Sequence, residues 1–322
     1  MGGMTFRIAV LDDYQNVALD LADWDSLGPD VTVVPFHDHV ADEDALVARL
    51  EPYDAIVAMR ERTPFPARVL RRLPNLRLLV TTGFVNAAID VPAARELGIT
   101  VCGTEGLAGM VSTVELTWGL ILALARRIPQ QDAVVRSGGW QLGLGMLLQG
   151  KTLGVLGLGN IGRAVIPVGR AFGMRVTAWS RNLTPEKAAE AGAEYRPREA
   201  FFAEADVVTV HLKLGPGSHG YVTRDDLRRM RPTALLVNTS RGPLIDEEAL
   251  AEALREGWIG GAALDVYGTE PLPPGHELRH LPGTVLSPHV GYVTEDSYRG
   301  YFAQIVEDVA AFLKGKPIRE LG

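Results

Sequence analysis

The 322-residue sequence has few of the features that mark metal-bound, secreted or nucleic-acid-binding proteins. Its single cysteine, Cys102, excludes an internal disulfide and any zinc site built from several cysteines. The 32 basic residues are scattered among 39 acidic ones, so we expect no partner that is nucleic acid or an anionic membrane. The N-terminus lacks the apolar core of a secretory signal, and the apolar run at 116–125 is too short to span a membrane. We therefore expect a cytoplasmic protein.

A metal site is not expected either. His37 and His39 flank Asp38 and have the spacing of a ligand pair, but they stand in a charged loop without a third ligand cluster.

Short apolar, β-branched segments alternate with capped helical segments, a rhythm that predicts parallel β-sheets. A first series of strands is expected at 6–11, 31–36, 55–58, 76–81 and 99–102. Helix starts are expected at Asp42, Thr63-Pro64 and Asp90, and the helix that starts at Asp90 should stop at Gly98.

The pattern changes between the two series. Ser112 and Glu115 have the spacing of a capping box in front of the apolar segment 116–128, which we expect to be a helix buried between domains or subunits. The Gly-rich stretch 137–150 follows and is expected to be a linker or a protruding arm.

The second series predicts a complete doubly wound sheet, followed by a long amphipathic helix at 294–315. Its strands are expected at 152–156, 174–179, 206–212, 234–238, 261–266 and 284–287. Its helix caps are expected at Thr184, Thr223 and Asp246, with Gly257 ending a helix. The boundaries indicate a central nucleotide-binding domain, residues 112–293, inserted into a discontinuous domain made of residues 1–111 and 294–322.

The segment GLGNIG follows a predicted strand and opens a predicted helix, which is the context of a dinucleotide-binding loop. Gly157 would make the tight turn, Gly159 would let the backbone approach a pyrophosphate, and Gly162 would let the helix pack closely. Asn160 and Ile161 lie in the first turn, where a helix N-terminus binds phosphate. The first series has no such motif, so we expect it to bind substrate.

The acidic residue that usually follows the second strand of such a domain is missing. Ser180 and Arg181 stand there instead. A carboxylate would accept hydrogen bonds from the ribose hydroxyls and repel a 2′-phosphate, whereas the guanidinium of Arg181 can bind that phosphate. We therefore expect NADPH to be preferred over NADH. The alternative is that Arg181 stacks on adenine and that both cofactors are accepted.

Four polar residues follow the predicted strands of the second series, at the edge where ligands bind to such sheets. Arg241, Asp265, Glu270 and His289 would together form a site for proton and hydride transfer. Arginine would bind an anion, histidine would move the proton, and Glu270 would orient the histidine ring. Each also has a structural alternative, respectively a surface ion pair, a loop cap, a rim charge and a packed turn. His211 either lines the nucleotide cleft or fills the core.

The stretch NTSRGPLIDEEALAEALREGWIGGAALDVYGTEPLP, followed by LSPHVGYVT, resembles the D-isomer-specific 2-hydroxyacid dehydrogenases, and GLGNIG lies at the family's position. The resemblance implies a Rossmann domain inserted into a flavodoxin-like α/β domain, and a homodimer built around the region after the first interdomain helix. It also implies that Arg241 binds the substrate, that Glu270 supports the general acid/base His289, and that Asp265 contacts the nicotinamide end.

The chain departs from the family in one substrate loop. Many members carry GVGxDNID over the substrate carboxylate, whereas residues 83–90 here read GFVNAAID. Gly83 with the backbone of Phe84 and Val85 is still expected to bind the carboxylate, but the bulkier side chains change the pocket. Arg60 either adds positive charge to this loop or is solvated.

We therefore expect an NAD(P)-dependent reductase of small 2-oxo acids such as glyoxylate or hydroxypyruvate. Glu270 supports this chemistry, because formate dehydrogenases of the same superfamily, which move no proton, have glutamine there. A phosphoglycerate-oxidising enzyme is a variant of this hypothesis. The alternative class is a dinucleotide-sensing, corepressor-like binding protein, which would bind cofactor without turnover.

Overall fold

The computed structural model describes residues 5–322 and forms two compact units. Unit 1 comprises the residues up to Ala108 together with Thr294–Gly322, and unit 2 comprises Gly109–Val293. The chain thus leaves unit 1, completes unit 2 and returns to unit 1 by its last helix. Each unit contains one parallel β-sheet, so the expected α/β fold with a doubly wound sheet is confirmed.

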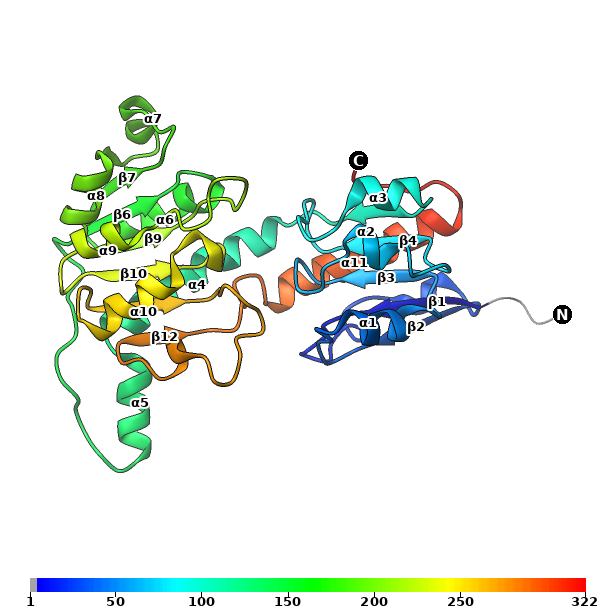
Figure 1. The fold of residues 1–322 in the computed structure, drawn as a ribbon, viewed down its shortest axis with the longest axis horizontal. Coiled ribbons are helices and arrows are strands. Elements are labelled where there is room, and N and C mark those ends of the chain that lie inside the picture. Colours follow the sequence, from blue (N-terminus) through cyan, green and yellow to red (C-terminus); the bar gives the residue numbers. More distant parts are fainter. Residues whose placement is uncertain (1–4) are drawn as a thin grey trace. The chain divides into compact units, whose positions relative to one another are not determined.

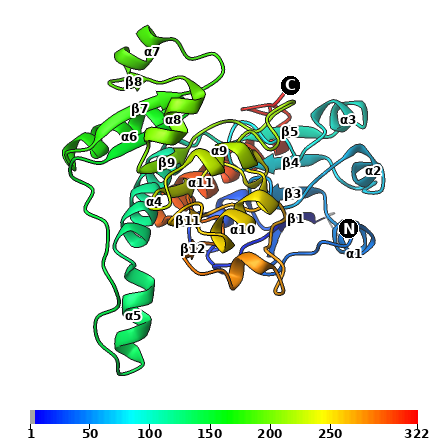
Figure 2. The same cartoon turned by 60° about the vertical axis from the view of Figure 1, so that its left-hand side comes forward.

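The sheet of unit 1 has the strand order β2-β1-β3-β4-β5 and is parallel throughout (Figures 1 and 2). This is the flavodoxin-like order, in which the direction of winding reverses beside β1. All residues of β3 and β4 are buried, as expected for central strands covered on both faces. The strands are β1 (Phe6–Val10), β2 (Val31–Pro35), β3 (Ala55–Ala58), β4 (Leu78–Thr81) and β5 (Thr100–Gly103).

The helices of unit 1 mostly begin where the sequence places their caps. Asp42, Asp90 and Thr294 each accept a hydrogen bond from the first turn of the helix that follows. The predicted start at Thr63 is wrong, because Phe65 pairs with Ile89 in a β-bridge and delays the helix. The helices are η1 (Trp24–Leu27), α1 (Glu43–Leu50), α2 (Ala67–Leu70), α3 (Val91–Glu96) and α11 (Glu295–Leu313).

The sheet of unit 2 has the order β12-β11-β10-β9-β6-β7-β8. It contains the six predicted strands and a seventh, β8, which is only two residues long and gave no apolar run to recognise. The strands are β6 (Thr152–Leu156), β7 (Arg175–Trp179), β8 (Glu194–Tyr195), β9 (Val207–Val210), β10 (Leu235–Asn238), β11 (Gly261–Leu264) and β12 (Thr284–Leu286).

Helices cover the sheet of unit 2 with two separate apolar clusters. Apolar side chains of α4 (Leu107–Ala125) and α6 (Asn160–Ala171) belong to one cluster. Those of α8 (Arg198–Glu204), α9 (Arg224–Arg229) and α10 (Glu247–Arg255) belong to the other. The remaining helices are α5 (Ile128–Arg136), α7 (Pro185–Glu190), η2 (Gly242–Leu244) and η3 (Glu277–Arg279).

Helix α4 differs from the sequence-based expectation in its start. It begins at Leu107, so Ser112 lies inside the helix and the predicted capping box is wrong. The Ser112 hydroxyl contacts the carbonyl oxygens of Gly109 (3.1 Å) and Gly291 (2.9 Å) instead. The longer helix contains an 18-residue window, Ala108–Ala125, which by length and composition could cross a membrane. More than half of that window is buried, however, as in the core helix of a soluble protein.

Helix α5 and the segment that follows it project away from the sheet of unit 2 (Figures 1 and 2). We call residues 128–147 the arm. The side-chain amide of Gln131 ties the arm together, since it donates to the Leu142 carbonyl (2.6 Å) and accepts from the Leu142 N–H (3.0 Å). Large apolar side chains on the arm are exposed, namely Ile128, Val135, Trp140, Leu142, Leu144 and Leu147.

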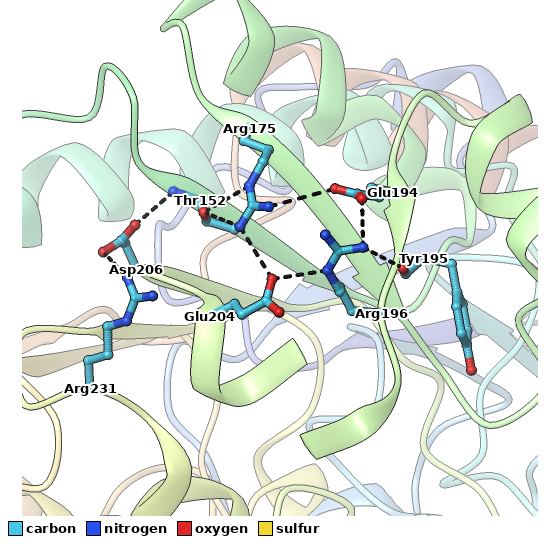
Figure 3. Close-up of polar contacts among 8 residues, drawn as sticks. All are labelled: Thr152, Arg175, Glu194, Tyr195, Arg196, Glu204, Asp206 and Arg231. Atoms are coloured by element: carbon cyan, nitrogen blue, oxygen red, sulfur yellow. Dashed lines mark hydrogen bonds and ion pairs between the residues drawn. The ribbon is translucent and has the colours of Figure 1, made fainter. Parts of the chain in front are cut away.

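A polar network joins the amino-terminal ends of the strands in unit 2 (Figure 3). Asp206 is buried there and accepts hydrogen bonds from the Thr152 N–H (2.8 Å) and from Arg231 (3.1 Å). Glu204 binds Arg175 and Arg196 at the same end. These three arginines are therefore paired with carboxylates, so an anion site is expected at the opposite end of the sheet.

Replacement of the buried Asp206 should lower the free energy of unfolding more than replacement of the more exposed Glu204. We expect Asp206→Ala to lower the free energy of unfolding by about 2 kcal/mol, because the Thr152 N–H then stays buried without its acceptor. Glu204→Ala, which removes more exposed ion pairs, should cost less than about 1 kcal/mol. Urea unfolding of both variants checks this, and equal losses would show that burial does not decide the difference.

Candidate active site

The dinucleotide-binding loop has the geometry that its glycines predict. Gly157 follows β6 with φ of 96°, and a side chain there would press against the backbone of His211. A side chain at 162 would collide with the Gly157 carbonyl oxygen, so the first turn of α6 can lie against the loop only because Gly162 is glycine. A Cβ atom at position 159 would have no other atom within 4 Å. The loop is thus tightly packed at Gly157 and Gly162, whereas Gly159 between them has free space beside it.

That open position fits the phosphates of a dinucleotide. Gly159 is the N-cap of α6, and Asn160 and Ile161 form its exposed or half-buried first turn. The first N–H groups of a helix have no partner within the helix and attract negative charge. A pyrophosphate bound at Gly159 would be held by these N–H groups.

The turn after β7 carries Ser180 and Arg181, as the sequence indicates. The Arg181 N–H donates to the Tyr221 hydroxyl (2.9 Å), and its guanidinium lies 5.5 Å from the centre of the Tyr221 ring. Arg181 is exposed, and no carboxylate within residues 5–322 forms an ion pair with it. This part of the edge therefore offers an unneutralised cation.

His211 lies beside the glycine loop and is 8% exposed. Its Nε2 is 2.9 Å from the Thr209 hydroxyl, and no partner within the described residues is found for its Nδ1. Burial lowers the pKa of His211 to about 3, so the ring is neutral. Of the two alternatives that the sequence left open, core packing and lining the cleft, the position beside Gly157 is compatible with both.

Arg241 follows β10, and the side chain of Asn238 holds its backbone. The Asn238 side chain donates to the Arg241 carbonyl (3.0 Å) and accepts from the Ser240 N–H (3.0 Å), which fixes the turn. Next to it, Gly242 lies so close to the backbone of Tyr267 and Gly268 that any side chain would collide. The turn after β10 therefore packs directly on the turn after β11.

Asp265 follows β11, is 1% exposed, and binds the turn after β12. One carboxylate oxygen accepts from the Ser287 hydroxyl (2.6 Å) and the Val290 N–H (2.9 Å), and the other accepts from the Gly291 N–H (2.9 Å). Burial raises the pKa of the Asp265 carboxyl, and these hydrogen bonds oppose the rise. The carboxylate thus forms hydrogen bonds with residues before and after His289.

His289 has a left-handed backbone conformation, with φ of 54°, which is uncommon for a residue other than glycine. Its Nδ1 is 2.6 Å from Glu270 Oε2, and the other Glu270 oxygen accepts from the Tyr267 N–H (2.9 Å). Because a carboxylate only accepts hydrogen bonds, Nδ1 carries a proton and Nε2 is left to exchange one with a ligand. His289, which can exchange a proton, and the cation Arg241 therefore follow β12 and β10, the two strands that flank β11 in one sheet.

Tyr267 is a residue that sequence reasoning missed. Its hydroxyl lies 2.8 Å from the Ser287 carbonyl oxygen and 3.2 Å from that of Leu264, so it joins the ends of β11 and β12. Burial raises the pKa of Tyr267, which keeps the hydroxyl protonated as a donor. Its place two residues after Asp265 was the only available signal.

In unit 1 the predicted substrate loop lies at the carboxyl ends of β3 and β4. Gly83 has φ of 92°, and the Arg60 guanidinium lies where a side chain at 83 would be. Arg60 itself is left-handed, with φ of 54°, and its N–H donates to the Thr82 hydroxyl (2.9 Å). Phe84 and Val85 are exposed, and their N–H groups make no hydrogen bond within residues 5–322. The assignment of this loop to a substrate carboxylate stays a prediction.

Comparison with known proteins agrees with this geometry. Residues 118–291 match the family described as D-isomer specific 2-hydroxyacid dehydrogenase, NAD binding domain. A glyoxylate reductase from Aeropyrum pernix is 42% identical over 77% of this chain and 76% of its own length. One from Thermococcus litoralis is 36% identical over 84% of each chain. The crystal structure of a phosphoglycerate oxidoreductase from Vibrio cholerae is 40% identical with a TM-score of 0.91, covering 96% of this chain and 99% of that one.

Because His211 is buried and neutral, we expect it to contribute to the loss of folding stability at acidic pH. Since its pKa is depressed in the fold, its contribution to stability is present above the unfolded value of 6.5 and is lost as the pH falls toward about 3. Between pH 7 and pH 5 the wild type should therefore lose about 2 kcal/mol more free energy of unfolding than His211→Gln. Urea unfolding at both pH values measures this. The exposed His219→Gln should behave as wild type, and the idea fails if His211→Gln does too.

Proposed function

The chain belongs to the D-isomer specific 2-hydroxyacid dehydrogenase family, and we propose that it reduces small 2-oxo acids such as glyoxylate or hydroxypyruvate. As a member of this family it is an oxidoreductase that acts on the CH–OH group of 2-hydroxy acids and uses a nicotinamide dinucleotide. The observation that carries the proposal is the contact of 2.6 Å between His289 and Glu270, at the ligand-binding edge of the sheet.

In the proposed reaction the residues of this chain bind the reactants and supply the proton. The glycine loop and the first turn of α6 would hold the dinucleotide, whose reduced nicotinamide supplies a hydride. Arg241 would bind the substrate carboxylate and polarise the 2-oxo group. His289, oriented by Glu270, would donate a proton from Nε2 to the carbonyl oxygen while carbon 2 receives the hydride. The product is the 2-hydroxy acid.

The identity of the acid rests on the relatives. Proteins from Aeropyrum pernix and Thermococcus litoralis carry the name glyoxylate reductase, which supports a small substrate. The Vibrio cholerae relative is named a phosphoglycerate oxidoreductase, so a phosphorylated 2-oxo acid is a second candidate. Steady-state reduction of glyoxylate, hydroxypyruvate, pyruvate, phenylpyruvate and phosphohydroxypyruvate would rank them by kcat/KM. Absence of turnover on all of them would contradict the proposal and favour a cofactor-sensing protein.

Loss of Arg241 or His289 should remove most of this activity. We expect Arg241→Ala to lower kcat/KM for the best 2-oxo acid by about 100-fold, through the loss of a charge-assisted pair in the transition state. His289→Ala should lower kcat by about 100-fold or more, because no proton donor remains. His276→Ala is the matched control, since His276 also binds a carboxylate, that of Glu247 at 3.1 Å. Wild-type turnover in the Arg241 and His289 variants would refute the roles.

We also propose that NADPH is preferred over NADH. The support is the unneutralised cation at Arg181 and the absence of a carboxylate at Ser180, where an acidic residue would repel a 2′-phosphate.

Arg181→Ala should raise the KM for NADPH by about tenfold and leave the KM for NADH within about twofold, because only NADPH carries the phosphate. Steady-state kinetics with both cofactors measure this. Arg228→Ala removes an exposed arginine that stacks on Trp258 instead, and it should change neither constant. Equal effects of Arg181→Ala on both cofactors would contradict the preference.

The oligomeric state is proposed to be a homodimer that uses the arm. Residues 128–147 expose large apolar side chains, with Leu144 95% and Trp140 74% exposed. Exposed large apolar side chains gathered on one projecting segment are typical of a protein interface.

Leu144→Glu should shift the protein from dimer to monomer at micromolar concentration, because a charge would have to be buried in the interface. Sedimentation velocity measures the change. Leu97→Glu alters another exposed leucine, in unit 1, and should leave the dimer intact. A wild-type monomer, or a Leu144→Glu dimer as tight as wild type, would rule out this use of the arm.

A further inference from the structure

Two aromatic rings and two guanidinium groups pack together at the end of β7. The ring centres of Trp179 and Tyr221 are 5.6 Å apart, and both side chains are buried. The guanidinium of Arg198 lies 4.9 Å from the Trp179 ring and 5.4 Å from the Tyr221 ring. The guanidinium of Arg181 lies 5.5 Å from the same Tyr221 ring. Tyr221 is therefore the ring that the two arginines share.

The two arginines differ in how their charge is used. Arg198 donates through Nε to Asp226 (2.9 Å) and through Nη2 to the Tyr221 carbonyl (2.7 Å). Its hydrogen bonds with the buried Asp226 raise the pKa of Arg198 and neutralise its charge locally. Arg181 has no such carboxylate within residues 5–322 and is exposed. The cluster thus presents one net positive charge to solvent, and Arg181 carries it.

Tyr221 fixes Arg181 in two ways. Its hydroxyl accepts a hydrogen bond from the backbone N–H of Arg181 at 2.9 Å, and its ring lies beneath the Arg181 guanidinium. The turn is closed further by the Leu183 N–H, which donates to the Ser180 carbonyl at 3.0 Å. A guanidinium that stacks on a ring keeps the N–H groups along its edge available. Holding it there in advance reduces the entropy lost when it binds an anion.

We propose that Tyr221 is a positioning residue for cofactor selection, which holds Arg181 ready to bind the phosphate on the adenosine ribose of NADPH. This inference rests on the NADPH preference proposed above and adds the residue that makes Arg181 effective. The stacked, hydrogen-bonded guanidinium suits a phosphate because its planar edge can donate two parallel hydrogen bonds. Arg198, already bound to Asp226, supports the Tyr221 ring and does not itself contribute a free charge.

The test uses binding and needs no turnover. Calorimetry on the full-length protein measures the Kd of adenosine 2′,5′-bisphosphate and of adenosine 5′-monophosphate, which differ by the 2′-phosphate alone. We expect the wild type to bind the bisphosphate at least about tenfold more tightly, and Arg181→Ala to remove that advantage. Tyr221→Phe, which loses the hydroxyl, should weaken bisphosphate binding about threefold. Tyr221→Leu, which also loses the ring, should weaken it about tenfold.

The monophosphate and a second arginine serve as controls. Binding of the monophosphate should stay within about twofold in both Tyr221 variants, and Arg228→Ala should change neither Kd. If the Tyr221 variants weaken both probes equally, or neither, the positioning role is wrong, although the NADPH preference stands as long as Arg181→Ala removes the advantage. If the wild type binds both probes equally, the preference fails and the positioning role fails with it. Thermal unfolding reports whether the variants fold, and Tyr221→Phe decides alone if Tyr221→Leu does not.

Discussion

The buried carboxylate of Asp265 is the constraint on which the candidate site depends. Its oxygens accept from the Ser287 hydroxyl and from the N–H groups of Val290 and Gly291, so they hold the chain on either side of His289. Without these acceptors, the left-handed backbone of His289 would have little to stabilise it. Glu270 can orient the imidazole only because this turn is already in place. Asp265 therefore acts through the backbone, whatever further contact it makes with a cofactor.

The two ends of the sheet in unit 2 use charge differently. At the amino-terminal ends of the strands, arginines bind carboxylates in the network around Asp206 and Glu204. At the carboxyl ends, the turns carry the open glycine loop and the unneutralised Arg181. Ligands of a doubly wound sheet bind at the carboxyl ends of its strands. The exposed arginine without a carboxylate partner, Arg181, lies at that same end.

Much of this arrangement could be predicted from the sequence, and the failures have physical causes. The strand before GLGNIG and the caps Asp42, Asp90, Thr223 and Asp246 are recognisable because they depend on local chemistry. The expectation at Ser112 was wrong because this residue lies inside a longer helix, where its hydroxyl contacts the carbonyl oxygens of Gly109 and Gly291. Tyr221 gave no signal, and Tyr267 gave only its place near Asp265, since their importance comes from residues distant in sequence, Arg181 and Ser287. Spacing along the chain indicates which edge a residue reaches but not which hydrogen bonds it makes there.

We propose that Glu270 makes His289 an effective proton donor, and one kinetic comparison tests this role most directly. Glu270 and Glu247 are both carboxylates that bind a histidine in unit 2, at 2.6 Å and 3.1 Å respectively. The measurement is kcat for reduction of the best 2-oxo acid by Glu270→Ala and by Glu247→Ala. We expect kcat to fall by about 100-fold in the first variant and by less than about fivefold in the second. Retention of wild-type kcat in Glu270→Ala, or an equal fall in both variants, would contradict it.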